Sequence, residues 1–118
     1  MLSKEHRLTR RSDFQLLSRK GRSWANRLLI LKAKPNSLLV SRYGFSVSKA
    51  IGNAVARNRT KRQLREIVRK RNLKPGWDVL IIARAAIVGS RFNDIERAVE
   101  QLMVQACLLE SEHEKASA

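Results

Sequence analysis

The segment IGNAVARNRTKRQLREIVRKR, residues 51–71, combines a hydrophobic repeat with the densest charge in the chain. At about 100° per residue, its apolar side chains fall on one side of a helix. They are Ala56, Leu64, Ile67 and Val68, with Thr60 between them. The repeat therefore predicts an ordered helix with one packed face, rather than a disordered basic tail.

The rest of this predicted helix is cationic, with Glu66 as the single acid between residues 57 and 71. Arginines that serve solubility are normally interleaved with acids, so this density indicates a polyanion partner. Gly52 permits a tight turn and Asn53 is a good N-cap, so the first turn offers free N–H groups to an anion. The side chains expected to point away from the core are Asn58, Arg62, Arg65 and Arg69, and those expected at the edges, within reach of a cleft on the sheet, are Arg57, Arg59 and Lys61.

The composition describes one basic domain. The chain has 118 residues, 43% of them hydrophobic, and a net charge of +15 from 25 Lys and Arg against 10 Asp and Glu. This length supports one core, and this charge favours a polyanionic ligand. The basic residues concentrate in residues 1–76, so residues 77–118 are expected to be scaffold. The single cysteine, Cys107, excludes a disulfide framework and is predicted to be a small core residue.

The elements before the basic helix are predicted to be a helix and two extended regions. Ser12 and Gln15 have the spacing of a capping box, which predicts a short helix that Gly21 ends. The apolar run 27–34 predicts a strand. Residues 38–49 predict either one bent strand or two strands.

Gly44 is expected to break the second extended region. Side chains alternate between the two faces of a strand, and here one face carries only small residues. Such a face suits either solvent or the close approach of a ligand. The side chains expected on one face are Phe45 and Val47, and those expected on the other are Gly44, Ser46 and Ser48.

The last third predicts an interior strand and a scaffold helix. Residues 77–84, WDVLIIAR, are apolar on both faces at their centre, as interior strands are. Asn93 and Glu96 have the spacing of a second capping box. Together the elements predict an α+β sandwich of one domain, residues 1–118, with residues 1–11 as a mobile basic arm and 112–118 as a frayed tail.

Groups for protein-based catalysis are sparse. The only histidines, His6 and His113, lie near opposite ends, and no metal-ligand or nucleophile motif is present. Asp13, Glu66 and Asp78 are far apart in sequence, so a catalytic carboxylate pair needs the fold to bring them together. The sequence therefore predicts a binding protein with no catalytic and no metal site of its own. No apolar run is long enough to span a membrane and no signal peptide is visible, so a cytoplasmic location is expected.

Residues 45–68, FSVSKAIGNAVARNRTKRQLREIV, resemble the signature of the bacterial ribonuclease P protein family. Its core, R-N-R-x-K-R-x-x-R, corresponds to residues 57–65. The resemblance extends to a D-F pair and a K-G pair near the N-terminus, an A-N-R triplet at residues 25–27, and a hydrophobic strand that ends in A-R. It covers about residues 8 to 110.

The resemblance implies a subunit of a ribonucleoprotein that removes the 5′ leader from precursor tRNA. A large RNA subunit would carry the active site and bind the catalytic Mg²⁺. The family fold is α-β-β-β-α-β-α, with one mixed sheet and a left-handed βαβ crossover that contains the basic helix. This order favours two strands within residues 38–49.

The resemblance also implies the binding residues. In the family the arginine-rich segment contacts the catalytic RNA, and a cleft between the first helix and the sheet binds the single-stranded leader. Phe14 matches an aromatic residue of that cleft. Ser18 stands where the family often has a second aromatic residue, and Lys32 stands where it sometimes has a tyrosine, so leader binding is expected to be more electrostatic. The expected RNA contacts are Lys49, Asn53, Arg57, Asn58, Arg59, Lys61, Arg62, Arg65 and Arg69, and the expected leader-cleft residues are Phe14, Lys32, Ser46 and Ser48.

Two other classes of protein share the size and charge of this chain. A ribosomal protein would bind RNA without a processing role, and a small nucleoid protein would bind DNA. Both lack the R-N-R signature. The expected partners are therefore ribonuclease P RNA and the precursor tRNA leader, with no DNA and no membrane.

Overall fold

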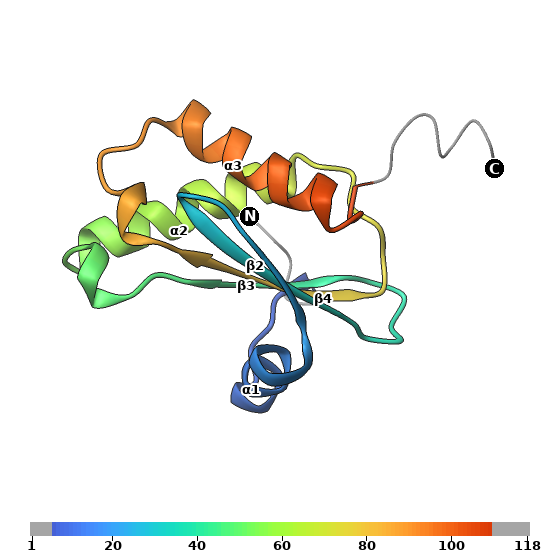
Figure 1. Cartoon of the computed structure of the whole chain (residues 1–118). Coiled ribbons are helices and arrows are strands. Elements are labelled where there is room, and N and C mark those ends of the chain that lie inside the picture. Colours follow the sequence, from blue (N-terminus) through green and yellow to red (C-terminus); the bar gives the residue numbers. More distant parts are fainter. Residues whose placement is uncertain (1–5, 110–118) are drawn as a thin grey trace.

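The computed structural model describes residues 6–109. The predicted α-β-β-β-α-β-α order is confirmed, and the strands form one mixed sheet (Figure 1). The elements are α1 Arg11–Lys20, β1 Arg22–Ala25, β2 Leu29–Pro35, β3 Arg42–Ser46, the 3₁₀ turn η2 Lys49–Ile51, α2 Ala54–Arg69, β4 Trp77–Ala83, the 3₁₀ turn η3 Ala85–Ile87 and α3 Phe92–Gln105.

The strand order is β1-β2-β4-β3, so β4 is an interior strand as predicted. It pairs antiparallel with β2 and parallel with β3. Val79 and Ile81 on one face and Leu80 on the other are all buried, because helices cover both sides of this strand. The parallel β3–α2–β4 connection is a crossover through the basic helix. Its left-handed sense stays a prediction from the resemblance.

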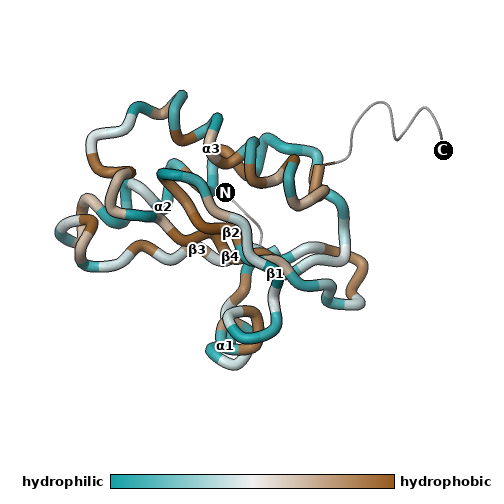
Figure 2. The backbone as a smooth tube through the Cα atoms, viewed as in Figure 1, coloured by the Kyte–Doolittle hydropathy of each residue, from teal (hydrophilic) through white to brown (hydrophobic). Residues whose placement is uncertain are grey.

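The three helices lie on opposite faces of the sheet, with α2 and α3 on one face and α1 alone on the other (Figure 1). The larger hydrophobic cluster lies between the sheet and the α2–α3 pair. A smaller cluster, formed by Leu8, Leu17 and Leu80, lies under α1. Figure 2 shows the hydrophobic residues concentrated in the central strands between these two layers.

The expectation of two strands within residues 38–49 is wrong. Three strands do precede the basic helix, but the additional one is β1, at residues 22–25. Only β3 forms there, and Gly44 pairs with Leu80 inside it instead of breaking it. The ring of Phe14 packs directly on this position. A Cβ added to Gly44 would lie 2.6 Å from Phe14 Cε1. Glycine is thus required for a close approach between α1 and the sheet, not for a turn.

The two predicted capping boxes are wrong. Helix α1 begins at Arg11 and α3 at Phe92, and neither N-cap residue, Arg10 or Arg91, forms a side-chain cap hydrogen bond. Gly21 does end α1, but its φ of −71° is not left-handed. Its added Cβ would lie 2.5 Å from the Leu17 carbonyl oxygen, so space again explains the glycine.

Cys107 is exposed, which contradicts its prediction as a core residue. The hydrophobic repeat of α3 is buried through Met103, but the helix ends at Gln105. Cys107 lies beyond this end with a φ of 58°, so its side chain no longer follows the helical repeat.

The N-terminal segment pairs with the outer edge of β3. Arg7 forms a parallel bridge with Tyr43, and the Leu8 N–H donates to the Tyr43 carbonyl oxygen at 2.8 Å. Leu8 is buried under α1. This part of the predicted arm therefore covers a sheet edge, whereas residues 1–5 of the arm and the predicted frayed tail lie outside the described residues.

Tyr43 makes the stability of the fold depend on pH in the alkaline range. Burial raises the pKa of its phenol to about 12 from the usual 10.0. The folded state therefore keeps this proton at a pH where the unfolded chain has lost it, so stability falls as the pH rises above about 10. We expect urea denaturation to show an extra loss of ~1 kcal/mol at about pH 11 in the wild type relative to Tyr43→Phe. Parallel losses in the two proteins would contradict this account.

Among residues 6–109, none of the helices has the length and apolar character needed to cross a membrane.

Candidate nucleic-acid interface

The start of α2 has the predicted geometry. Gly52 adopts a φ of 153°, and the Asn53 Oδ1 accepts the N–H of Ala56 at 2.9 Å. A Cβ added to Gly52 would lie 3.0 Å from the Ala56 Cβ. The N-cap prediction is confirmed, and the turn before the helix is fixed by both backbone conformation and space.

The packed and open faces of α2 are those that the hydrophobic repeat predicts. Leu64, Ile67 and Val68 are buried against the sheet. Asn58 and Arg62 lie on the opposite, exposed face. The apolar contacts thus hold this polar face outward along the helix.

Two of the basic side chains, Arg65 and Arg59, lie differently from the prediction, and a third, Arg69, is exposed as predicted but paired with an acid. Arg65 does not point away from the core, because its guanidinium carbon lies 6.0 Å from the Phe45 ring on β3. Arg59 does not reach towards the sheet cleft, because it borders a hollow next to η3 on the other edge of α2. Arg69 is paired, with its Nη2 2.6 Å from the Glu66 Oε1. This hydrogen bond lowers the pKa of Glu66.

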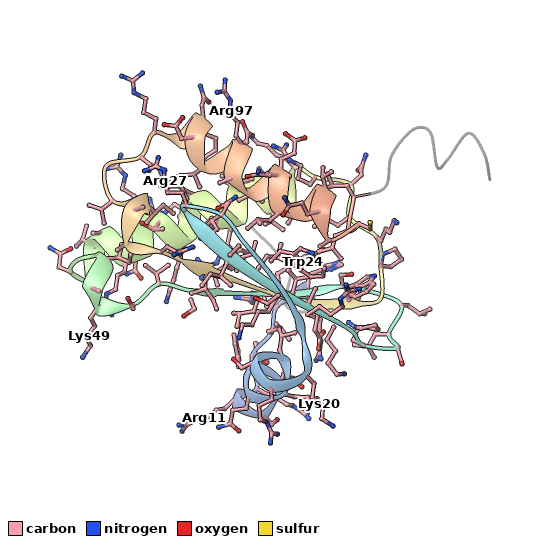
Figure 3. All side chains as sticks on the ribbon, viewed as in Figure 1. Arg11, Lys20, Trp24, Arg27, Lys49 and Arg97 are labelled. Atoms are coloured by element: carbon pink, nitrogen blue, oxygen red, sulfur yellow. The ribbon has the colours of Figure 1, made fainter. Side chains whose placement is uncertain are left out.

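The other cations of α2 keep their charge available. Within the described part of the chain, no carboxylate lies within ion-pair distance of the basic residues in the first three turns of α2 or of Arg65. Lys49 adds a further exposed charge from the turn before the helix (Figure 3). Within residues 6–109, the cations that have no ion-pair partner are Lys49, Arg57, Arg59, Lys61, Arg62 and Arg65.

Helix α1 crosses the opposite face of the sheet. Phe14 packs over Gly44 in β3, and Leu17 packs with Leu80 in β4. At the end of the helix, the Lys32 Nζ on β2 donates to the Ser18 carbonyl oxygen at 3.4 Å. Lys32, Leu80 and Gly44 are register partners, so α1 follows one cross-strand row of the sheet.

An open groove of about 650 Å³ runs along one side of α1. Phe14 is its aromatic residue, and the rest of its wall is polar or basic. The next cross-strand row on the same face of the sheet lies two residues away from the row under α1. It is formed by Ile30, Ile82 and Ser46. The groove is lined by Arg11, Phe14, Gln15, Ser18 and Arg19.

A second hollow, of about 220 Å³, connects the two faces around the outer edge of β3. Phe14 lines it from the α1 side, and Arg65 lines it from the α2 side. Phe45 and the N-terminal segment at Arg7 complete its wall. Because Phe14 also lines the groove beside α1, this hollow joins that groove and the basic helix into one continuous surface, and Phe14 is the predicted cleft residue that lines both hollows.

The structure therefore brings together most of the predicted site. Phe14, Lys32 and Ser46 share one sheet face, whereas Ser48 lies beyond the end of β3, before η2. The sequence interpretation missed the cations on α1 and on the N-terminal segment. The spacing of Arg11, Gln15 and Arg19 at every fourth residue was a signal for a polar helix side. The residues missed are Arg7, Arg11, Gln15 and Arg19.

Two of the three candidate catalytic carboxylates, Asp13 and Asp78, come together in the fold, but both accept hydrogen bonds from Arg42. The Arg42 Nε and Nη2 donate to the Asp78 Oδ1 and Oδ2 at 2.9 and 2.7 Å, and the Arg42 Nη1 donates to the Asp13 Oδ2 at 3.4 Å. The Asn36 Nδ2 also donates to the Asp78 Oδ1. The hydrogen bonds that Arg42 donates to Asp78 raise the pKa of Arg42. These carboxylates thus anchor α1 and the turn before β3.

Within residues 6–109, no three His, Cys, Asp or Glu side chains gather where they could hold a metal ion.

Comparisons with known proteins agree with this geometry. The ribonuclease P family model matches residues 2–107. The ribonuclease P protein component of Dehalococcoides mccartyi is 45% identical over 112 residues, which cover 95% of this chain and 93% of that protein. The solved RNase P protein of Staphylococcus aureus superimposes with a TM-score of 0.82 at 33% identity, covering 89% of this chain and 98% of the other. The RNase P protein of Thermotoga maritima gives a TM-score of 0.78 at 28% identity, with the same coverage.

Proposed function

Since the chain belongs to the ribonuclease P protein family, we propose that it is the protein subunit of the ribonucleoprotein that removes the 5′ leader from precursor tRNA. The observation that carries this proposal is the continuous surface that joins α2 to α1 around β3. It combines unpaired cations with an accessible aromatic ring. These are the two features that bind single-stranded RNA, through phosphate neutralisation and base stacking.

We assign the hydrolysis to the RNA subunit and to Mg²⁺ bound by that RNA. Within residues 6–109, the two carboxylates that come together do not fit a resident metal, since Asp13 and Asp78 are both engaged by Arg42. The work of this chain is then binding and orientation. Its cations lower the repulsion between two RNA molecules, and its α1 groove holds the leader next to the cleavage site.

The surface divides into two parts with different RNA ligands. Arg62 and Asn58 face outward from α2 and are assigned to the RNA subunit. Phe14 is assigned to the leader, with its ring on a leader base. Ser18 and Lys32, the two residues that stand in place of family aromatics, contact each other, because the Lys32 ammonium donates to the Ser18 carbonyl oxygen. They replace an aromatic wall with a polar one. Arg65 lies between both parts, above Phe45.

A reconstitution experiment tests this function. Purified protein is added to ribonuclease P RNA at low Mg²⁺ and near-physiological salt, where the charge repulsion between RNA molecules is strongest. We expect the protein to restore cleavage of precursor tRNA at the mature 5′ end, and high Mg²⁺ or high salt to replace it in part. A protein that recovers ribosomal RNA in a pulldown and leaves precursor cleavage unchanged would instead be a structural RNA-binding protein.

Single arginine variants should separate the two RNA ligands. Arg62→Ala is expected to reduce the salt dependence of binding to the RNA subunit by ~0.7–0.9 in log Kd per log salt, because one phosphate contact is lost. Arg65→Ala should weaken precursor binding more than mature tRNA binding. Arg69→Ala is the matched control, since Glu66 already pairs with that guanidinium. Equal salt slopes for wild type and Arg62→Ala would exclude Arg62 from the RNA interface.

A further inference from the structure

A groove between the first half of α2 and the segment that follows β4 has no role in the function proposed above. It lies where η3 and the loop after it pass the start of α2 (Figure 1), and it encloses about 650 Å³. None of its twelve lining residues is acidic. The geometry points to a binding site for one unstacked nucleotide of the RNA subunit, and this inference rests on the proposed function.

Two exposed valines supply apolar walls for a base. Val55 on α2 is 77% exposed and Val88, after η3, is 60% exposed, and both line the groove. They are two of the five large hydrophobic residues that are exposed in the described part of the chain. Exposed apolar side chains that gather at a hollow mark a binding surface. Every nucleobase offers a flat face that such walls can cover.

Arg59 supplies the charge for the phosphate of that nucleotide. It is exposed, lines the groove, and forms no ion pair within residues 6–109. Its neighbours in sequence, Asn58 and the nearby Arg62, lie on the outward face of α2. An RNA strand on that outward face therefore reaches the groove without crossing the protein, and the absence of acids favours an anionic occupant over a basic peptide.

Polar groups at the same walls can recognise the edge of a base. The Thr60 hydroxyl donates to the Ala56 carbonyl oxygen at 3.1 Å, and the Ser90 hydroxyl donates to the Ala86 carbonyl oxygen at 3.2 Å. Both hydroxyl oxygens therefore remain free to accept from a base amino group. Gln63 also lines the groove and offers an amide donor and acceptor. Apolar walls with a few convergent polar groups are typical of sites for small planar ligands.

The first test maps RNA at the groove. In a Cys107→Ser background, which removes the exposed native thiol, Val88→Cys carries a tethered iron–EDTA group. Val104→Cys is the matched control, since Val104 is an exposed valine on α3 outside the groove. In the complex with ribonuclease P RNA, we expect hydroxyl radicals from position 88 to cut a short run of unpaired nucleotides in that RNA, and those from position 104 to leave that run intact. Cuts that appear only on added precursor tRNA, or no RNA cuts at all, would overturn the inference.

The second test measures affinity. Val88→Glu places a carboxylate at the groove and is expected to weaken binding to the RNA subunit roughly tenfold, as for the loss of one stacked base. Val104→Glu adds the same charge elsewhere and should change it far less. Removing the base at the mapped nucleotide should reproduce the loss and make Val88→Glu almost silent. Equal losses for the two valine variants would overturn the inference, whereas a wild-type protein that does not bind ribonuclease P RNA would overturn the proposed function itself.

Discussion

Gly44→Ala is expected to displace Phe14 and to lower the free energy of unfolding by about 1–3 kcal/mol, the usual cost of overpacking. The added methyl group would lie 2.6 Å from Phe14 Cε1 and 2.9 Å from Phe14 Cζ, so the ring and the start of α1 must move. Substitutions at residues in direct contact have non-additive effects on stability, and here the sign of that non-additivity can be predicted. Urea denaturation of the single and double variants measures it.

Phe14→Ala in the same chain should relieve the clash. The double variant Gly44→Ala with Phe14→Ala is therefore expected to be more stable than the sum of the two single losses predicts, by roughly 1 kcal/mol or more. Both single variants should also weaken binding of precursor tRNA with a long leader and leave mature tRNA binding unchanged. Additive losses of stability would mean that the ring does not pack on Gly44, and unchanged leader dependence would remove Phe14 from the leader site.

Asp78→Ala is expected to destabilise the fold by about 2–4 kcal/mol, because it leaves the Arg42 guanidinium without its bidentate partner. The Asp78 side chain is 11% exposed and that of Arg42 is 24% exposed, so solvent offsets only part of the loss. The Asn36 amide also loses an acceptor. The free energy of unfolding in urea measures the effect.

Asp13→Ala is the matched control for Asp78→Ala. Its carboxylate lies 3.4 Å from the same guanidinium and is more exposed, so a loss below about 1 kcal/mol is expected. A second variant, Arg42→Met with Asp78→Leu, replaces the pair with apolar side chains and should recover part of the stability. Similar losses for Asp13→Ala and Asp78→Ala would show that the bidentate geometry is not what stabilises this corner.

The elements with dense hydrophobic patterns were predictable from the sequence. The repeat around Leu64 identified α2 and its packed face, and the two-sided apolar run at residues 77–84 identified an interior strand. In both cases the pattern reflects burial against the whole sheet. The Asn53 cap was also predictable, because it depends on contacts within four residues.

The wrong predictions involve contacts that are distant in sequence or weak in pattern. Strand β1 is short and mostly exposed, so its sequence RSWA has no alternating burial to recognise. Gly44 resembles a break until Phe14, thirty positions earlier, is placed on it. Arg65 sits at the margin of the helical wheel, and only the position of Phe45 on β3 decides which way it turns.

The two parts of the candidate site, the basic helix and the surface around Phe14, were predictable, but the hollow that connects them was not. The basic helix follows from local charge, and the role of Phe14 follows from the family resemblance. The hollow that joins them depends on β3 being an edge strand, which residue patterns alone do not give. The groove beside η3 likewise needs the relative placement of α2 and the chain after β4.

The central place of β4 determines when this chain can fold during synthesis. Strands β2 and β3 each pair with β4 and not with each other. Until residues 77–83 leave the ribosome, only the β1–β2 hairpin can form, and the apolar side of α2 has no sheet to pack on. For that interval the arginine-rich segment is a nascent basic stretch surrounded by ribosomal and transfer RNA. Completion of the sheet by β4 is therefore the step that decides which side of α2 is buried and which side stays open to RNA.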